Sequence, residues 1–389
     1  MSELRPDTLA VRGGLVRSAF DETSEGLFLT SGYVYSSAQE AEAAFKDEID
    51  RFVYSRYGNP TVAMFQERMR LLEGAQACFA TATGMSAVFV ALAALLGKGE
   101  RVVSSRGLFG SCFVILDEIL PRWGVETVFV DGGDLEQWRG ALAEPAAAVF
   151  FESPSNPMQE LVDIAAVCDL AHGAGAKVVV DNVFGTPVFS KPLEQGADVI
   201  VYSATKHIDG QGRTLGGAIL GTSDFIQGPV KNLMRHIGPS MSPFNAWVLL
   251  KGLETLSLRV ERMSASALAL AGVLEAHQKI SRVIYPWLES HPQHELARKQ
   301  MYGGGTVVTF ELVGGKDEAF AVMNALEIVD ISNNLGDAKS MITHPATTTH
   351  RRLGPQARLA VGITDGVLRV SVGLEDVHDL VEDFQRALG

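Results

Sequence analysis

Short apolar runs alternate with helix-length segments between residues 77 and 221, and this alternation limits the folds that the chain can adopt. The runs are rich in Val, Ile, Phe and Ala, which is typical of strands covered by helices on both faces. Strands are predicted at residues 77–80, 101–104, 126–130, 147–151, 177–180, 199–202 and 217–220. Helices are predicted between them at residues 85–96, 110–120, 135–142 and 164–173. The sequence therefore predicts an α/β fold with a mostly parallel seven-stranded sheet in a large domain.

The pattern changes beyond Pro243. A long helix without proline is predicted from Ala246 to about Ala276. It is followed by predicted strands and a helix near residues 306–312, 318–326, 327–331 and 368–372. Residues 1–58 show no sustained hydrophobic period, so they are predicted to form an arm that is ordered by contact with something else. We therefore expect an arm at 1–58, a large domain at 59–245 and a smaller C-terminal α+β domain at 246–389.

Composition excludes several classes of function. The formal charge of −13 and the isoelectric point near 5.2 argue against a nucleic-acid partner, because binding phosphate backbones requires a basic face. The three cysteines, Cys78, Cys112 and Cys168, are far apart and odd in number, so neither a disulfide framework nor a metal site is expected. The longest apolar run, residues 85–96, is too short to span a bilayer. We expect a cytoplasmic protein without a membrane partner.

A lysine follows one of the predicted strands directly. The apolar run after Asp198 ends in Ser203, Thr205 and Lys206, and a glycine-rich loop comes next. An amine in this position can bond covalently to an aldehyde cofactor, while the hydroxyl groups and nearby amides hold a phosphate group. Pyridoxal 5'-phosphate is such a cofactor. A solvated loop lysine is the alternative, and this segment by itself leaves both interpretations open.

Two other segments agree with a phosphorylated cofactor. Residues 81–86, Thr-Ala-Thr-Gly-Met-Ser, follow a strand and open a helix, as a phosphate-binding turn would. Asp181 ends the strand at 177–180, where its carboxylate could keep a pyridine nitrogen protonated. A plain tight turn and a capping aspartate are the alternatives. The loop at 210–215 lacks the third glycine of a dinucleotide fingerprint, and no Walker A motif occurs, so both nucleotide motifs are rejected.

Taken together, these segments resemble the Cys/Met-metabolism family of pyridoxal-phosphate-dependent enzymes, which have the fold-type I architecture. The matching stretches follow one another from about residue 50 to residue 375. They are Tyr54–Thr61, Ala82–Met85, Glu152–Pro157, Asp181–Phe184, Ser203–Lys206, Gly304–Glu311, Leu335–Asp337, Thr343–Ala346 and Leu368–Glu375. So many ordered matches over this span indicate the family as a whole.

The resemblance implies a role for each matching residue at the cofactor. Lys206 would carry the cofactor and move protons, Asp181 would face the pyridinium nitrogen, and Asn156 would lie against the ring hydroxyl. The residues that would hold the phosphate group are Gly84, Met85, Ser203 and Thr205.

The resemblance also implies contacts beyond the cofactor ring. Arg369 would clamp the substrate carboxylate, and Asn334 would also contact the substrate. Tyr54 and Arg56 would reach the cofactor phosphate of a neighbouring subunit, which gives the arm its function. A homotetramer built from two dimers is therefore expected.

Two positions depart from the family pattern. Phe109 stands in a turn where a tyrosine usually stacks on the cofactor, and it can stack but cannot donate a proton to a leaving group. This weakens a lyase interpretation. His207 stands where a phenyl or phenol ring is commoner. The Phe109 turn, the loop at 206–213 and the segment at 331–337 resemble the O-succinylhomoserine sulfhydrylases within the family.

The expected reaction is a γ-replacement in methionine biosynthesis, in which O-succinyl-L-homoserine and sulfide give L-homocysteine and succinate. Cystathionine γ-synthase, with cysteine as the nucleophile, and methionine γ-lyase are the enzymatic alternatives. A catalytically inactive binding protein of the same fold is the non-enzymatic alternative, and the intact set of Lys206, Asp181 and Arg369 argues against it. Arg106 and Arg213 are candidates to bind the distal succinyl carboxylate, with an ordinary surface position as the alternative for both.

Overall fold

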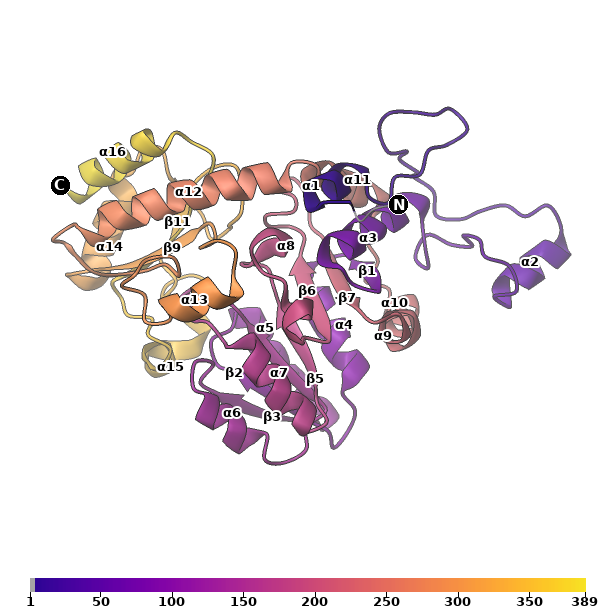
Figure 1. Ribbon diagram of the computed structural model, residues 1–389, viewed down its shortest axis with the longest axis horizontal. Coiled ribbons are helices and arrows are strands. Elements are labelled where there is room, and N and C mark those ends of the chain that lie inside the picture. Colours follow the sequence, from indigo (N-terminus) through magenta and orange to yellow (C-terminus); the bar gives the residue numbers. More distant parts are fainter. Residues whose placement is uncertain (1–3) are drawn as a thin grey trace. The chain divides into compact units, whose positions relative to one another are not determined.

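The computed structural model describes residues 4–389 (Figure 1). The chain forms two compact units. Unit 1 comprises the residues up to Ala94 together with Val201–Thr205 and Arg213–Thr255. Unit 2 comprises Leu95–Ile200, Lys206–Gly212 and Leu256–Gly389. The predicted division at residues 58 and 245 follows the order of the sequence and stays a prediction.

The larger sheet has the strand order β1-β7-β6-β5-β4-β2-β3. Its strands are β1 (Ala77–Thr81), β2 (Arg101–Ser105), β3 (Glu126–Val130), β4 (Ala148–Glu152), β5 (Lys177–Asp181), β6 (Val199–Ser203) and β7 (Gly217–Gly221). β2 pairs with β3 and β4 in parallel, β4 pairs with β5 in parallel, and β1 pairs with β7 in antiparallel fashion. The predicted mostly parallel seven-stranded sheet is confirmed, and every strand lies within about one residue of its predicted position.

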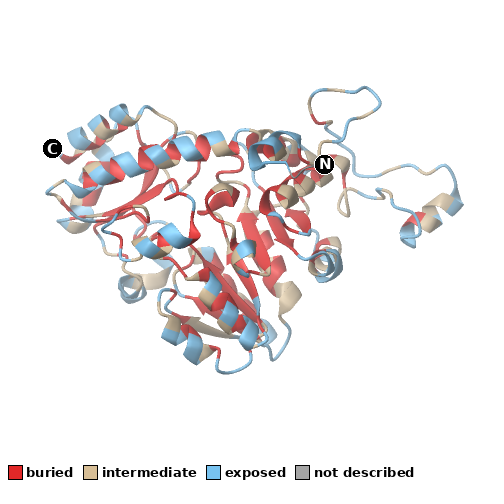
Figure 2. Cartoon of the chain, viewed as in Figure 1, coloured by how far each residue is buried: buried red, intermediate tan, exposed pale blue. Residues whose placement is uncertain are grey.

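The central parallel strands β2, β4 and β5 are largely buried, as their apolar sequences require, whereas β3 at the edge of the sheet is partly exposed (Figure 2). Helices α6 (Leu135–Ala141) and α7 (Ile164–Gly173) supply apolar side chains to this core, where Trp138 packs edge-on against Phe151. The register pairs Glu152 of β4 with Asp181 of β5, both at the last residue of their strands. Parallel pairing thus brings two carboxyl groups to one edge of the sheet.

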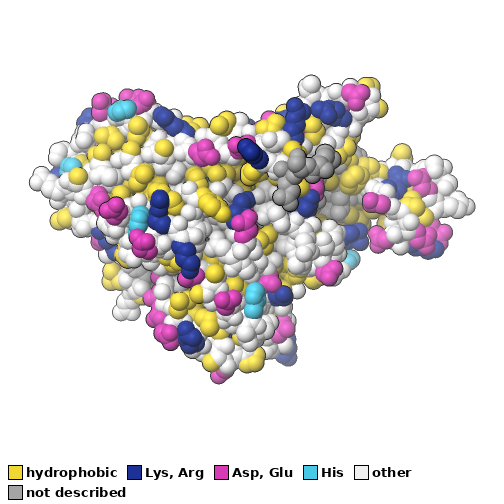
Figure 3. Space-filling model, viewed as in Figure 1, with side chains coloured by type: hydrophobic (Ala, Val, Ile, Leu, Met, Phe, Trp, Pro, Cys, Tyr) yellow, Lys and Arg dark blue, Asp and Glu magenta, His cyan; other side chains and the backbone are white. Residues whose placement is uncertain are grey.

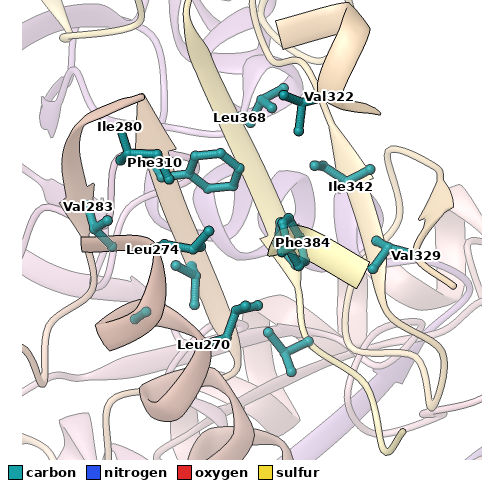
Figure 4. Close-up of a cluster of buried hydrophobic side chains, with 14 of the residues drawn as sticks. Leu270, Leu274, Ile280, Val283, Phe310, Val322, Val329, Ile342, Leu368 and Phe384 are labelled. Carbon is teal, nitrogen blue, oxygen red and sulfur yellow. The ribbon is translucent and has the colours of Figure 1, made fainter. Parts of the chain in front are cut away.

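The smaller sheet lies in unit 2 and has the order β10-β11-β12-β9-β8. Its strands are β8 (Ile280–Ile284), β9 (Val307–Leu312), β10 (Asp330–Ile331), β11 (Met341–Thr343) and β12 (Val367–Ser371). Helices α12 (Leu256–Glu275), α14 (Gly315–Ala325) and α16 (Val377–Leu388) close its core, in which Phe310 and Phe384 meet edge to face (Figure 4). β12 is flanked by strands on both sides, so its side chains, including that of Arg369, are buried.

Unit 1 combines β1 and β7 with the arm and with helices α1 (Pro6–Arg12), α3 (Pro60–Glu73) and α11 (Pro243–Leu253). α3 begins after Asn59, whose side chain accepts the Thr61 N–H at 2.9 Å, and a proline opens its first turn. The fully buried guanidinium of Arg68 on α3 donates to Glu25 at 2.6 Å and to the Gly13 carbonyl at 2.9 Å. These bonds attach the N-terminal segment to α3.

The arm carries helix α2 (Ala38–Phe45), around which acidic side chains gather on the surface (Figure 3). Several of its apolar side chains face solvent, and Phe20 and Val34 are 90% and 91% exposed. Apolar groups exposed to this extent in one segment are typical of a surface that another chain covers.

Three of the predicted elements were wrong in extent. The single helix at 246–276 is two helices, α11 and α12, because the chain passes from unit 1 to unit 2 after Thr255. The helix at 110–120 is a short α-helix, α5 (Gly110–Val114), continued by a π-helical and a 3₁₀ turn. The strand at 327–331 is only β10, and β8 and β11 were missed. The remaining helices are α4 (Gly84–Leu95), α8 (Thr186–Phe189), α9 (Ser223–Phe225), α10 (Lys231–Ile237), α13 (His294–Gln300) and α15 (Gly354–Ala360).

Helices between residues 4 and 389 are all too short or too polar to cross a membrane.

Candidate active site

Lys206 follows β6 and opens the glycine-rich loop, and its amine lies within unit 2. The amine donates a hydrogen bond to the Asn334 side-chain oxygen at 2.5 Å. Burial, with a smaller contribution from the positive charge of Arg369, lowers the pKa of Lys206 to about 8. A neutral amine, which can act as nucleophile or base, is therefore accessible near neutral pH.

Arg369 projects from the centre of the smaller sheet and is 1% exposed. Its Nη1 donates to the Asn156 side chain at 2.9 Å, and its Nη2 donates to the carbonyls of Asn333 and Asn334 at 2.9 and 3.2 Å. Its Nε has no hydrogen-bond partner among the described residues. Neutral oxygens alone surround the guanidinium, and burial lowers its pKa to about 10. A buried cation with a donor to spare is suited to binding a carboxylate.

Asp181 ends β5, and one of its oxygens accepts the Val183 N–H at 3.0 Å. Burial raises the pKa of this carboxyl group to about 7. A cationic ligand at this point would favour the charged form, so the residue is suited to a protonated ring nitrogen.

Phe109 stands immediately before α5 and is half-buried. Its backbone N–H donates to the Glu152 side chain at 2.7 Å. Glu152 is buried, and burial together with the charge of Asp181 raises its pKa well above the ordinary range. One ligand atom each from Cys112, Glu152 and Asp181 lies within 4.8 Å of the others. All three cysteines are buried.

Two histidines border this part of unit 2, and both are neutral. His207 bonds through Nε2 to the Thr306 hydroxyl at 2.7 Å, and burial lowers its pKa to about 3. His350 bonds through Nδ1 to the Thr349 hydroxyl at 2.8 Å, and burial lowers its pKa to about 4. His207 therefore places no positive charge beside Lys206. In this respect it is equivalent to the phenyl or phenol ring that is commoner at this position in the family.

The predicted phosphate turn lies in unit 1. Gly84 opens α4, and a Cβ atom at this position would lie 2.4 Å from the Cβ of Ser203, so only glycine permits this approach. The Thr83 hydroxyl accepts the Ser86 N–H at 3.0 Å, which caps the helix. Thr205 accepts the Gly216 N–H at 3.1 Å. The structure thus brings Gly84 and Ser203 together at a helix N-terminus, where free N–H groups favour an anion.

Tyr54 and Arg56 lie at the base of the arm in unit 1. The Arg56 guanidinium is 5.3 Å from the Tyr54 ring centroid and 4.7 Å from that of Tyr57, and it donates to the Arg235 carbonyl. Tyr54 remains 41% exposed. Their predicted contact with a neighbouring subunit stays a prediction.

The two arginines considered for the distal carboxylate both lie on the surface. Arg106 is exposed and donates to the Gln137 side chain at 3.3 Å, and Arg213 is exposed. The structure assigns neither of them a carboxylate-binding position.

Comparison with known proteins identifies the family. The sequence pattern of the Cys/Met metabolism PLP-dependent enzymes matches residues 7–389. The chain belongs to this family. It is 63% identical over 385 residues to O-succinylhomoserine sulfhydrylase of Mycobacterium tuberculosis, covering 98% of this chain and 95% of the relative. The enzyme of the same name from Pseudomonas aeruginosa is 49% identical, covering 98% and 94%, and L-methionine gamma-lyase of Porphyromonas gingivalis is 37% identical, covering 98% and 96%.

Solved structures agree with this assignment. MetB of Corynebacterium glutamicum matches with a TM-score of 0.94 and 28% identity over 99% of this chain and 98% of its own. A putative O-acetylhomoserine (thiol)-lyase of Campylobacter jejuni, which carries a pyridoxyl-lysine, matches with a TM-score of 0.95 and 30% identity over 99% and 100%. The fold-type I architecture and the use of pyridoxal phosphate are therefore established for this family member.

The residues of unit 2 fit this cofactor. Three half-buried groups meet its needs: the Lys206 amine with a lowered pKa suits an aldehyde, the Asp181 carboxyl group with a raised pKa suits a pyridinium nitrogen, and the Phe109 ring suits a ring face. Sequence reasoning named these three but treated Glu152 only as part of a motif. Its position at the end of β4, matching that of Asp181 on β5, is the signal that could have singled it out.

The lowered pKa of Lys206 predicts pH-dependent reactivity in cofactor-free protein. Below about pH 8 the amine is protonated and unreactive, and above it the amine is neutral, so acetylation of Lys206 should be half-maximal near pH 8. Arg369→Gln removes a neighbouring positive charge and should move this midpoint to higher pH. Pulse acetylation from pH 6 to 10 with peptide mass spectrometry measures it, with exposed Lys98 as internal reference. An unchanged midpoint in the variant would contradict the role given to Arg369.

Proposed function

We propose that this protein catalyses a γ-replacement in which O-succinyl-L-homoserine and sulfide give L-homocysteine and succinate, a step of methionine biosynthesis. The observation that carries the proposal is the 63% identity to the M. tuberculosis sulfhydrylase over nearly the whole chain. Lys206, Asp181 and Arg369, which the chemistry requires, are all present.

Substrate binding is assigned to Arg369 and the Asn333–Asn334 segment. The unpartnered Nε of Arg369 is available to the substrate α-carboxylate. The Nη groups donate to neutral oxygens, and they can exchange these for the charged carboxylate oxygens at little cost in free energy. Asn334 contacts Arg369 through its carbonyl and Lys206 through its side chain. A carboxylate that draws Arg369 away from Asn334 would also change the contact that holds the amine. Substrate binding would then release Lys206 for proton transfer.

Proton transfer is assigned to Lys206 and charge control to Asp181. When bound, the cofactor supplies an electron sink for the pair of electrons left at the substrate Cα. Lys206 in its neutral form removes the Cα proton and moves protons between the substrate carbons. Asp181 in its charged form keeps the ring nitrogen protonated. The phosphate group is assigned to Gly84, Met85, Ser203 and Thr205, the ring hydroxyl to Asn156 and the ring face to Phe109.

Phe109 favours an ester substrate over methionine. Succinate leaves as a carboxylate, whose conjugate acid has a pKa of about 4, so it needs no proton donor at neutral pH. A thiolate, with a conjugate acid of pKa about 8.5 or higher, leaves more readily when a general acid protonates it. The benzyl ring of Phe109 cannot supply that proton. This favours γ-replacement on a succinyl ester over methionine γ-lyase chemistry.

We also propose a cytoplasmic homotetramer built from two dimers, in which the arm contacts a neighbouring subunit. The exposed apolar side chains of the arm support a partner surface. A cavity of about 880 Å³ in unit 1, lined by arm residues such as Arg51 and Phe52 and by Phe79 of β1, offers space for a few side chains of a second copy of the chain. Tyr54 is exposed near this cavity's border at Val53, where it could reach another subunit.

Activity assays test the reaction. Purified protein with pyridoxal phosphate and O-succinyl-L-homoserine should release succinate and should form homocysteine with sulfide. Lys206→Ala should lower the rate by about 10²–10⁴-fold or more, since it removes the base and the attachment point. Succinate and thiol products are measured by chromatography with sulfide and cysteine supplied separately. Cystathionine from cysteine, with no homocysteine from sulfide, would reassign the protein to cystathionine γ-synthase.

Phe109→Tyr tests the leaving-group argument. The added phenol supplies a proton donor, so release of methanethiol from methionine should rise about tenfold or more. Succinate release from the ester should change less than about threefold, because that leaving group needs no proton. Both rates are measured on the same preparation, with Phe113→Tyr as a control for an added phenol elsewhere. Equal effects on both substrates would contradict the argument.

A further inference from the structure

A buried carboxyl group, that of Glu152, and a half-buried one, that of Asp181, lie side by side at the edge of the parallel sheet in unit 2. Glu152 and Asp181 are register partners, and one oxygen of each lies within 4.8 Å of the other and of the Cys112 sulfur. Glu152 is 5% exposed. Neither carboxyl group has an ion-pair partner among residues 4–389. Two full negative charges at this separation, away from water, strongly disfavour each other.

The surroundings of Glu152 are neutral hydrogen-bond donors. The Phe109 N–H donates to Oε1 at 2.7 Å, and the Asn156 N–H and the Cys112 thiol also interact with the carboxyl group. The nearest charged or titratable groups on neighbouring elements are Asp181, Cys112, His350, which faces the Leu108 and Asn156 backbone, and Arg369, which bonds the Asn156 side chain. Glu152 is thus the residue to which the turn before α5, with Phe109, is attached.

We propose that Glu152 is a positioning residue that stays protonated while Asp181 is ionised, so that the two carboxyl groups together carry one negative charge. The inference rests on the proposed role of Asp181 at the cofactor ring nitrogen. That nitrogen offers a cation to Asp181, whereas Glu152 faces only amides and a thiol. The single proton therefore belongs on Glu152, which keeps its bond to the Phe109 turn and leaves the negative charge at Asp181.

The pKa directions agree with a shared proton. Burial and the Asp181 charge raise the pKa of Glu152 well above its usual range, and burial raises that of Asp181 to about 7. A carboxyl group whose pKa is higher in the folded than in the unfolded protein stabilises the fold at low pH. It loses that stabilisation as the pH rises from about 4 through the folded value. In cofactor-free protein Asp181 should therefore reduce stability as the pH rises from about 4 to about 7, and Glu152 should extend this loss to higher pH.

Glu152→Gln is the direct test, because it preserves size and the oxygen that accepts the Phe109 N–H but cannot ionise. In cofactor-free protein its melting temperature should exceed that of the wild type at pH 8.5, and the difference should shrink at pH 6. With pyridoxal phosphate, its cofactor affinity should stay within about threefold of the wild type, and its visible absorption spectrum should keep the wild-type pH profile. Asp181→Asn should weaken cofactor binding by tenfold or more and change the spectrum.

The opposite assignment makes different predictions. If Glu152 were the ionised member, Glu152→Gln would remove the site's negative charge and resemble Asp181→Asn in affinity and spectrum. A Glu152→Gln protein that is less stable than the wild type at pH 8.5, or that does not fold there, would also overturn the proposal.

Glu160 provides a matched control. It is another partly buried carboxyl group of unit 2, and burial together with Asp131 raises its pKa to about 7. Glu160→Gln should also raise the melting temperature at pH 8.5. Added to Asp181→Asn, it should leave the spectral change caused by Asp181→Asn as it is. A wild-type protein that binds no pyridoxal phosphate would overturn the proposed function itself. If the wild type binds the cofactor normally but Glu152→Gln has the affinity and spectrum of Asp181→Asn, only this inference is overturned.

Discussion

Burial of charged groups without matching counter-charges governs the candidate site. Arg369 lies on three neutral oxygens, Lys206 on one, and Asp181 on a backbone amide. Burial therefore lowers the pKa values of Arg369 and Lys206 and raises that of Asp181, which favours the neutral form of each group. The positive charge of Arg369 adds to the lowering of the Lys206 pKa. The site is thereby prepared for ligands that bring the missing charges, a carboxylate for Arg369 and a protonated ring nitrogen for Asp181.

The fold holds these groups in place through strand ends and a sheet centre. Asp181 and Glu152 are fixed by the register of β5 and β4, and Arg369 by its position on β12 between two neighbouring strands. The loop that contains Asn333 and Asn334 links Arg369 to Lys206 by hydrogen bonds. Rigid elements therefore carry the charged groups, and a loop carries the contact that substrate binding would change.

Much of the architecture follows from local sequence, because the central parallel strands are largely buried and therefore consist of continuous apolar runs. Asp181 and Lys206 could be singled out for the same reason, since Asp181 directly follows such a run and Lys206 comes shortly after another. Glu152 was not singled out, because its importance comes from the strand beside it, and pairing between distant strands leaves no local signal. The bond between Lys206 and Asn334 joins residues that are far apart in the sequence and was not foreseen. The break between α11 and α12 was missed because neither proline nor a glycine pair marks it.

Lys206 is the residue to which pyridoxal phosphate is proposed to become attached. Borohydride reduction of the cofactor-loaded protein makes such a bond permanent, and peptide mass spectrometry then locates the added mass. The pyridoxyl group is expected on the peptide that contains Lys206, and no label is expected on the Lys206→Ala protein. A pyridoxyl group on another lysine of the loaded wild-type protein, or none at all, would contradict this proposal.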